Sequence, residues 1–580
     1  MKSQSRRDGA RILNSVGMHF STMAITLIIN GKSTEANAGI SLFDQAEAMG
    51  IDVPTSCRKQ GKCKECMVEV VEGMSALSPM TEAECHLKGN FRLSCQTFVT
   101  GPAGGVSSGQ VSGGQVRCHT MRRGHMRIER QACGLPASGQ ALELDPAVTR
   151  DGDRILIDGI EVERSTGPIH GIAMDLGTTT VVVRLMDLES GELIADTSFE
   201  NPQRFGGSEI MSRIAYDTSH PGRLLMRTLA GYLSHAIEKF PIDPRTIYEM
   251  VVVGNSTMRD LFFRQNVYSI GQTPYRSITE IEMSEGKRIT TSLVESGLRS
   301  LLPIHPKARV YGAPIISGHV GADAAACMLA ADLAHEERLV AIMDIGTNTE
   351  LVVGNKNRIL AASCPAGPAF EGGAIACGMP ALDGAIEEVA IGADGKFQIR
   401  VIGDGSPEGI CGSGLVDLLS ELLRTGRMNE RGRFDDVVDR IDFSHGENGD
   451  VYLLESDVNE LAQAKGANVA GLQAVFNTYG IDFDDVDMFY LAGGFGRHIN
   501  VEASKRIGLV PNLAPEKFVR AGNLAIEGAT IALLSKAKRQ ELEELVRKVQ
   551  HCRLETHPNF FDFFVGGCQF KAVEPISCAR

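Results

Sequence analysis

Four cysteines have the spacing expected of iron-sulfur cluster ligands. Cys57, Cys63 and Cys66 lie in TSCRKQGKCKECMVEV, separated by five and two residues, and Cys95 follows in RLSCQ after 28 more. Three thiolates from one tight loop and a fourth from a distant strand predict a 2Fe-2S cluster. Gly61 allows backbone amides to approach the cluster sulfurs, and such hydrogen bonds tune the potential.

A zinc site is the alternative use of these thiols, since four thiolates also bind Zn²⁺ tetrahedrally. Zinc ligands usually come as two close pairs, whereas these cysteines form a triplet and a single residue. Cys85 lies between the ligands in the acidic stretch TEAECHLKG and is predicted to be a bystander. The spacing therefore favours the 2Fe-2S cluster.

Two similar segments, MDLGTTTVVV from Met174 and MDIGTNTELV from Met343, each join an apolar strand, an aspartate and a Gly-Thr turn. The aspartate ends one strand and the turn begins the next, so backbone amides and hydroxyls converge on one spot. Such a turn holds phosphate, and the aspartate reaches Mg²⁺ through water. A single turn also occurs in plain hairpins, and aspartic proteases carry Asp-Thr-Gly or Asp-Ser-Gly instead. The pair predicts two half-domains that grip a triphosphate across a cleft.

Two glycine-rich segments complete the predicted nucleotide site. LAGGFGR places Gly493, Gly494 and Gly496 after the apolar strand MFYLA, where bare backbone accommodates adenine and ribose. GICGSGLVDLLSELL begins an amphipathic helix with Gly412, Ser413 and Gly414, which form an anion site or serve only close packing. The order of the four elements carries more weight than any one of them.

The cluster ligands belong to a small N-terminal domain, predicted over residues 23–100. A hairpin turns at Asn30-Gly31, and Ser41 caps the helix LFDQAEAMG that follows. Residues 1–22 show no packed-core pattern or secretory signal. They are interpreted as an over-extended start, with Met18 or Met23 as the true beginning.

Beyond the cluster domain we expect a linker and then the nucleotide-binding domain. Gly101 to Gln115 is nearly all glycine, serine and small residues, which predicts a flexible tether. With a small middle segment it makes up residues 101–168. This part includes a basic run at 122–130 that is either a solvated face or a docking surface. Residues 169–580 alternate strands and helices as an α/β domain does.

Composition excludes several classes of protein. The chain has 580 residues and a formal net charge of -14, which argues against nucleic-acid binding and suits docking to a basic patch on a protein partner. No apolar run reaches the roughly 18 residues that a membrane span needs. Four of the 14 cysteines form the tight metal-ligand pattern, and most of the others stand singly, which predicts a reducing cytoplasm. The late cysteines Cys552, Cys568 and Cys578 are too widely separated to suggest a second cluster.

The cysteine pattern, with ITLIINGK and RLSCQ, resembles a β-grasp 2Fe-2S ferredoxin over roughly residues 23–100. Its first gap is one residue longer than in plant-type ferredoxins. The paired phosphate turns resemble the actin/hexokinase-like (ASKHA, duplicated RNase H-like) superfamily. Together the parts resemble the reductive activators of corrinoid proteins, an α/β multidomain family. That likeness also rests on NPQRFGGSEIMSRI, VVVGNSTMRDLF, ISGHVGADAAA, CPAGPAFEGGAI and AGGFGRHINVEASKRIGLVP.

The resemblance implies the roles of individual residues. Asp175, Gly177, Thr178 and Thr179 would form the first phosphate turn, and Asp344, Gly346, Thr347 and Asn348 the second. Gly493, Gly494 and Gly496 would meet the adenosine. Asn255, Thr257 and Glu371 would line the γ-phosphate or act only as turn and cap residues. Asp175, Asp344 and Glu371 are the implied catalytic residues.

The resemblance also implies an activity: ATP hydrolysis with Mg²⁺ drives an electron from the 2Fe-2S cluster to a Co(II) corrinoid protein, regenerating Co(I) for methyl transfer. A low-potential donor would reduce the cluster. Two alternatives remain open: a ferredoxin carrier with a nucleotide-sensing domain, and a small-molecule kinase with a redox-sensing cluster. A homodimer is one assembly that the sequence leaves open.

Overall fold

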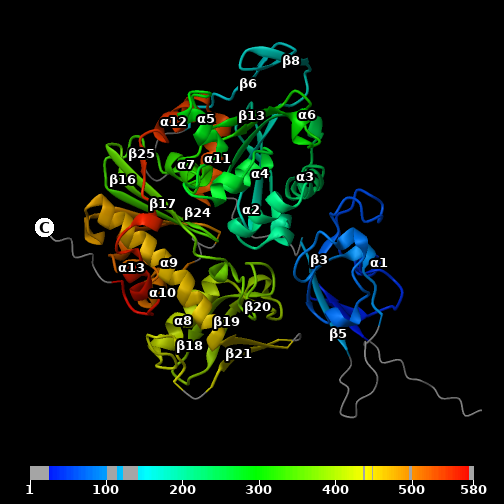
Figure 1. Cartoon of the computed structure of the whole chain (residues 1–580), viewed down its shortest axis with the longest axis vertical. Coiled ribbons are helices and arrows are strands. Elements are labelled where there is room, and N and C mark those ends of the chain that lie inside the picture. The colour runs from blue at the N-terminus through cyan, green and yellow to red at the C-terminus, as the bar shows by residue number, and fades with distance from the viewer. Residues whose placement is uncertain are drawn as a thin grey trace, which may run out of the picture.

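The computed structural model describes residues 25–100, 114–121, 142–435, 438–446, 449–494 and 499–573. The N-terminal cluster domain lies beside a larger two-lobed α/β part (Figure 1). The predicted N-terminal tail and the basic run at 122–130 lie outside the described residues. Among those described, no helix combines the length and the apolar character needed to cross a membrane.

A five-stranded sheet with the order β2-β1-β5-β3-β4 forms the cluster domain. The predicted hairpin joins its first two strands, and Asn30 and Gly31 both adopt the positive φ that its tight turn requires. The predicted helix is α1, capped by Ser41, whose side chain accepts a hydrogen bond from the Asp44 amide. The elements of this domain are β1 (Thr26–Ile29), β2 (Lys32–Glu35), α1 (Leu42–Ala48), β3 (Met67–Glu72), β4 (Phe91–Leu93) and β5 (Gln115–Thr120).

Strand β5 extends this domain beyond the expected end at residue 100. It pairs in parallel with β1 and antiparallel with β3, so it lies at the centre of the sheet. The glycine-rich segment predicted as a tether between domains therefore joins two parts of one domain, and Gln115 belongs to a strand. Residues 101–113 lie outside the described part of the chain. The chain passes from the cluster domain to the ATPase part through residues 122–141, a range that is likewise not described.

The small middle segment predicted before residue 168 packs onto the two-lobed α/β part. Its three strands are β6 (Val148–Asp151), β7 (Arg154–Ile157) and β8 (Ile160–Arg164). Val148, Ile155 and Ile157 are buried in one hydrophobic core with residues of both ATPase sheets. This segment is therefore a structural part of the two-lobed α/β body.

The internal repeat appears as two sheets with matching centres. The first sheet has the order β11-β10-β9-β12-β14-β13 and the second β24-β23-β15-β16-β17-β25. In each, an antiparallel trio pairs with a parallel strand, as a duplicated half-domain predicts. The first sheet comprises β9 (His170–Leu176), β10 (Thr180–Asp187), β11 (Leu193–Glu200), β12 (Ile247–Gly254), β13 (Leu293–Ser296) and β14 (Arg309–Gly312). The second comprises β15 (Val340–Ile345), β16 (Thr349–Asn355), β17 (Arg358–Cys364), β23 (Met488–Ala492), β24 (Phe518–Gly522) and β25 (Val549–His551).

Helices cover both sheets, and two of them pack between the lobes (Figure 1). Helices α7 and α11 share a buried core with both sheets. Their approach is so close that a Cβ on Gly528 would lie 2.0 Å from the Ala326 carbonyl oxygen. The helices of the ATPase part are α2 (Ile210–Ser219), α3 (Leu224–Ile237), α4 (Ser256–Phe262), α5 (Ile278–Ser284), α6 (Gly297–Ser300), α7 (Ala322–Ala330), α8 (Gly412–Arg424), α9 (Glu455–Tyr479), α10 (Val501–Ile507), α11 (Leu524–Leu534), α12 (Lys536–Leu545) and α13 (Phe560–Gly567). Smaller strands in the second lobe are β18 (Ala385–Ile391), β19 (Phe397–Val401), β20 (Gly409–Ile410), β21 (Arg440–Gly446) and β22 (Gly449–Leu454).

Candidate cluster site and nucleotide cleft

The four predicted cluster cysteines meet at one end of the ferredoxin-like sheet. Met67 of β3 pairs with Leu93 of β4, which brings the flanking Cys66 and Cys95 together with their sulfurs 3.2 Å apart. Cys57 and Cys63 share a side-chain hydrogen bond. The hydrogen bond to Cys95 and burial raise the pKa of Cys66, and the charge of the nearby Cys63 adds to this. Cys85 is exposed and outside this group.

Backbone amides surround these sulfurs. Burial acts to raise the pKa of Cys57, but amides of Cys63, Lys62 and Gln60 donate to its sulfur and bring the pKa below its ordinary value. A hydrogen bond from the Cys66 thiol, opposed by burial and aided by the Gly61 amide, lowers the pKa of Cys95 to about 6.

The loop makes this arrangement by repeated left-handed turns. Arg58, Lys59, Gly61 and Lys64 all have positive φ. Successive amides in such turns form a concave nest for anionic groups. Four grouped thiols within an amide nest fit the demands of a 2Fe-2S cluster, whose sulfurs accept hydrogen bonds.

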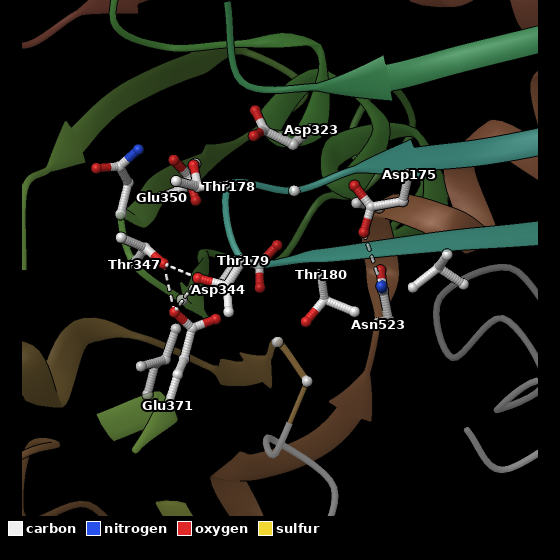
Figure 2. A pocket seen from close by; sticks show the side chains of 18 of the residues that line it. Asp175, Thr178, Thr179, Thr180, Asp323, Asp344, Thr347, Glu350, Glu371 and Asn523 are labelled. Atoms are coloured by element: carbon white, nitrogen blue, oxygen red, sulfur yellow. Dashed lines mark hydrogen bonds between the residues drawn. The ribbon is translucent and has the colours of Figure 1, made fainter. Parts of the chain in front are cut away.

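The two phosphate turns face each other across the cleft between the lobes (Figure 2). The hydroxyl oxygens of Thr179 and Thr347 lie 2.6 Å apart, although the residues are far separated in sequence. Glu371, at the end of the short helix η7 (Ala369–Glu371), accepts hydrogen bonds from both threonines, that from Thr179 over 3.0 Å. The lobes therefore present two hydroxyl-bearing turns and one carboxylate to a single point.

Carboxylates line the same cleft; Glu350 is buried, and Asp175, Asp323, Asp344 and Glu371 are partly exposed. Burial raises the pKa of Asp175 to about 7, and the charge of Asp344 adds to this effect. Burial also raises the pKa of Asp344 to about 6 and that of Asp323 to about 7. The pKa values of Glu350 and Glu371 are raised by burial as well. A group of poorly solvated carboxylates that repel one another is the environment that a hard divalent cation such as Mg²⁺ stabilises.

Several cleft residues were not singled out from the sequence. Asp323 lies in the first turn of α7, Glu350 lies in β16, and Asn523 donates to the Asp175 carboxylate over 2.8 Å. The Cys327 thiol donates to Asp344 over 3.3 Å. A usable signal existed for Glu350, since the corresponding position of the first repeat is the apolar Val181. Asp323 lies within the motif ISGHVGADAAA, but its place in the cleft depends on how α7 packs.

Most of the remaining predicted residues line the cleft, and a few lie outside its lining. Gly177, Thr178, Gly346, Asn348, Gly412, Gly493 and Gly494 line the cleft. Asn255 lines it too, caps α4, and donates to the Thr178 hydroxyl over 2.9 Å. Thr257 is buried outside the cleft lining, and Gly496 lies outside the described residues.

Ser413 and Gly414, predicted to form an anion site or to serve close packing, make packing contacts and do not line the cleft. The Ser413 hydroxyl donates to the Glu387 carbonyl over 2.9 Å. A Cβ on Gly414 would lie 2.4 Å from the Ile386 carbonyl oxygen. Both residues hold the start of α8 against β18, and only Gly412 faces the cleft.

Comparisons with known proteins match each part of the chain. A 2Fe-2S iron-sulfur cluster binding domain matches residues 27–100, the RACo middle region matches residues 170–336, and the C-terminal ASKHA domain of RACo matches residues 338–576. Fold and site thus define a 2Fe-2S ferredoxin domain joined to an ASKHA-type domain. The match to a 2Fe-2S domain favours an iron-sulfur cluster over zinc in this part of the chain.

Relatives extend the match over most of the chain. It is 34% identical over 447 residues to the corrinoid activation enzyme RamQ of Eubacterium limosum, covering 72% of this chain and 73% of the relative. It is 25% identical over 433 residues to the [Co(II) methylated amine-specific corrinoid protein] reductase of Methanosarcina barkeri, covering 68% and 76%. The solved structure of a reductive activator for corrinoid, iron-sulfur protein covers 95% of this chain and 99% of its own, with 25% identity and a TM-score of 0.69. The chain belongs to the family of reductive activators of corrinoid proteins.

Proposed function

We propose that this chain uses ATP to drive one electron from a 2Fe-2S cluster onto the Co(II) form of a corrinoid protein, restoring Co(I). One observation carries the proposal: a single chain holds a four-thiol group and a two-lobed cleft whose phosphate turns meet. Family membership supports it, because one relative is named as a corrinoid activation enzyme and another as a reductase of a Co(II) corrinoid protein. The chain is accordingly an ATP-dependent reductive activase.

The energetics explain why an ATPase accompanies the cluster. A plant-type 2Fe-2S ferredoxin has a potential of about -400 mV. The Co(II)/Co(I) couple of a protein-bound corrinoid lies lower, so contact alone leaves most of the cobalt as Co(II). ATP binding and hydrolysis to ADP and phosphate supply the difference by changing the affinity of the lobes for the Co(II) partner. A low-potential donor upstream returns the electron to the cluster.

Each lobe contributes one half of the nucleotide site. Gly177, Thr178 and Thr179 offer amides and hydroxyls to the triphosphate from one side, and Gly346, Thr347 and Asn348 from the other. Gly493 and Gly494 leave bare backbone for the adenosine. Asp175 and Asp344 would hold Mg²⁺, which reduces the charge repulsion among the phosphates when bound. Glu371, between the turns, is placed to meet the terminal phosphate or the attacking water.

The cluster loop and the free thiols bear on partner and compartment. Cys57, Cys63, Cys66 and Cys95 would hold the cluster, which accepts and donates one electron at a time. All cysteines of the described residues are free thiols, which supports a reducing cytoplasm as the location.

We assign the corrinoid protein to a methyltransferase system, where Co(I) is the nucleophile. We keep a homodimer as the assembly to test.

The test is anaerobic reduction of a Co(II) corrinoid protein from a methyltransferase system, with limiting reductant, followed by cobalt absorbance. Co(I) should accumulate with ATP and Mg²⁺, and much less with ADP. Cluster reduction without any nucleotide-dependent change in the cobalt spectrum would favour the nucleotide-sensing ferredoxin. Transfer of labelled phosphate to a metabolite would favour the kinase.

A further inference from the structure

The ferredoxin domain is docked against the first ATPase lobe by the loop that carries its cluster ligands (Figure 1). Glu65 lies between Cys63 and Cys66, and its carbonyl accepts from the Tyr232 hydroxyl of α3 over 2.6 Å. Its carboxylate lies 3.1 Å from Nε2 of His235, also on α3. Gly231 makes room for it, because a Cβ there would lie 2.8 Å from the Glu65 carboxylate. The cluster loop is thus seated on one helix of the ATPase.

A second contact comes from the segment that begins NPQRFGG, residues 201–216, whose sequence had no assigned role. Phe205 packs edge-on against His86 of the ferredoxin domain, with ring centroids 5.8 Å apart. The Tyr216 hydroxyl donates to the His86 carbonyl over 2.9 Å. This segment therefore forms part of the docking surface.

The same segment grips the first phosphate turn. The Asn201 amide donates to the Thr179 carbonyl over 2.7 Å, and its side chain donates to the Gly177 carbonyl over 2.8 Å. Arg213 donates to the Thr178 carbonyl over 2.7 Å. A shift of the turn must therefore move residues 201–216.

Arg204 lies where these two sets of contacts meet. Its guanidinium lies 3.4 Å from Glu69 of β3 and over the Phe91 ring of β4, at 6.0 Å from the centroid. It also forms an ion pair with Glu200 at 3.5 Å and interacts electrostatically with the cleft residue Glu371. The two ferredoxin strands that it contacts adjoin Cys66 and Cys95. Arg204 is therefore shared between the cluster domain and the cleft.

The neighbouring Gln203 indicates that residues 201–216 adopt a second conformation besides the docked one. Its side chain is fully buried, and both polar atoms lack a hydrogen-bond partner among the residues that the structure describes. A buried amide left unpaired is costly, and such groups concentrate where a segment serves function rather than stability.

We propose that residues 201–216 couple the nucleotide cleft to ferredoxin docking, with Arg204 as the positioning residue, so that a bound triphosphate loosens the docked domain. The inference rests on the proposed ATP binding. With the two turn hydroxyls 2.6 Å apart, a terminal phosphate that bonds to both must displace the Glu371 carboxylate and part the turns. The added negative charge draws Arg204 towards the cleft and away from Glu69. Loosening exposes the cluster loop for the partner.

Hydrogen-deuterium exchange on the full-length, cluster-loaded protein tests this coupling, with a non-hydrolysable ATP analogue and Mg²⁺ as the probe. The analogue should raise exchange in the docked ferredoxin segment around His86 to Phe91. In Arg204→Met this segment should exchange at one rate with or without the analogue, whereas Arg204→Lys should restore part of the response. Arg227→Met, an exposed change on α3, is the matched control and should behave as wild type.

Calorimetry provides the reciprocal measurement. If the analogue weakens docking, a change that weakens docking must tighten the analogue by the same factor. Glu69→Gln should therefore lower the analogue Kd by about 5-fold or more, on the usual scale of coupling between sites. Absence of any analogue binding to wild type would refute the proposed function. Tight binding with unchanged exchange, or an Arg204→Met protein that responds as wild type, would overturn the coupling alone.

Discussion

Replacing Asp344 by asparagine should separate the proposed ATP hydrolysis from electron transfer. Asp344 is the last but one residue of β15, lines the cleft, and accepts a hydrogen bond from Cys327. Asparagine keeps the size and an acceptor oxygen but removes the charge. If that charge serves the proposed Mg²⁺ and phosphate chemistry, hydrolysis should fall by about 100-fold or more, the scale of a lost preorganised electrostatic group.

The same change should stabilise the protein when divalent cations are chelated. Burial raises the pKa of Asp344 from 3.8 to about 6, a shift of about two units or ~3 kcal/mol. A raised folded pKa means that stability falls as pH rises between about 4 and 6, and the penalty is complete above that range. At pH 8 the variant, which escapes the penalty, should therefore gain about 3 kcal/mol in unfolding free energy.

Three measurements on one preparation check this prediction: phosphate release, denaturant unfolding in chelator, and cobalt absorbance with a Co(II) corrinoid partner. The variant should keep a normal 2Fe-2S spectrum, accept electrons from a chemical donor, and fail to accumulate Co(I) with ATP. Asp562→Asn, an exposed change on α13, is the control and should alter none of them. Full Co(I) formation by a variant without ATPase activity would refute the coupling of hydrolysis to reduction, and unchanged stability would refute the assigned cost of burying the Asp344 charge.

Further predictions address each domain. Cys57→Ser and Cys95→Ser should keep ATP hydrolysis, because the ligands lie outside the cleft. Both variants should lose the 2Fe-2S electron paramagnetic resonance signal and electron delivery. Activation of the corrinoid partner at the wild-type level would contradict the ligand assignment. Glu84→Gln should destabilise the ferredoxin domain by about 3 kcal/mol at neutral pH, since it leaves the buried Arg92, 2.8 Å from Glu84, without its counter-charge. Burial opposes ionisation, but Arg92 and the Thr81 and Leu93 amides hold the pKa of Glu84 below 4.5. The wild-type advantage should therefore be complete above about pH 4.5 and disappear as the pH falls below it, as measured by urea unfolding. Gly528→Ala should lower the melting temperature, because its Cβ would meet the Ala326 carbonyl oxygen at 2.0 Å, whereas Gly566→Ala, with nothing within 4 Å, should not.

Local patterns in the sequence were sufficient to predict the individual motifs of the cluster site and of the cleft. The cysteine spacing, the Asn-Gly hairpin and the Ser41 cap depend on residues close together in the chain, so their geometry follows from the local order of side chains. The repeated motif at Asp175 and Asp344 predicted two facing half-domains, because each copy of the motif is itself a local pattern. The family resemblance rested on these motifs, and the matches over residues 27–100, 170–336 and 338–576 confirm it.

Tertiary packing decided which distant residues and elements each motif contacts. Strand β5 joins the ferredoxin sheet through parallel pairing with β1, a contact that its own six residues do not reveal. Asp323 and Asn523 reach the cleft because α7 and α11 pack between the sheets. Ser413 and Gly414 lie against β18 because α8 presents only its first residue to the cleft. Arg204 links the cleft to the cluster domain by contacts more than a hundred residues apart in the chain. Local order specifies each turn and cap, but the neighbours of a side chain across the molecule depend on how whole elements bury their apolar faces.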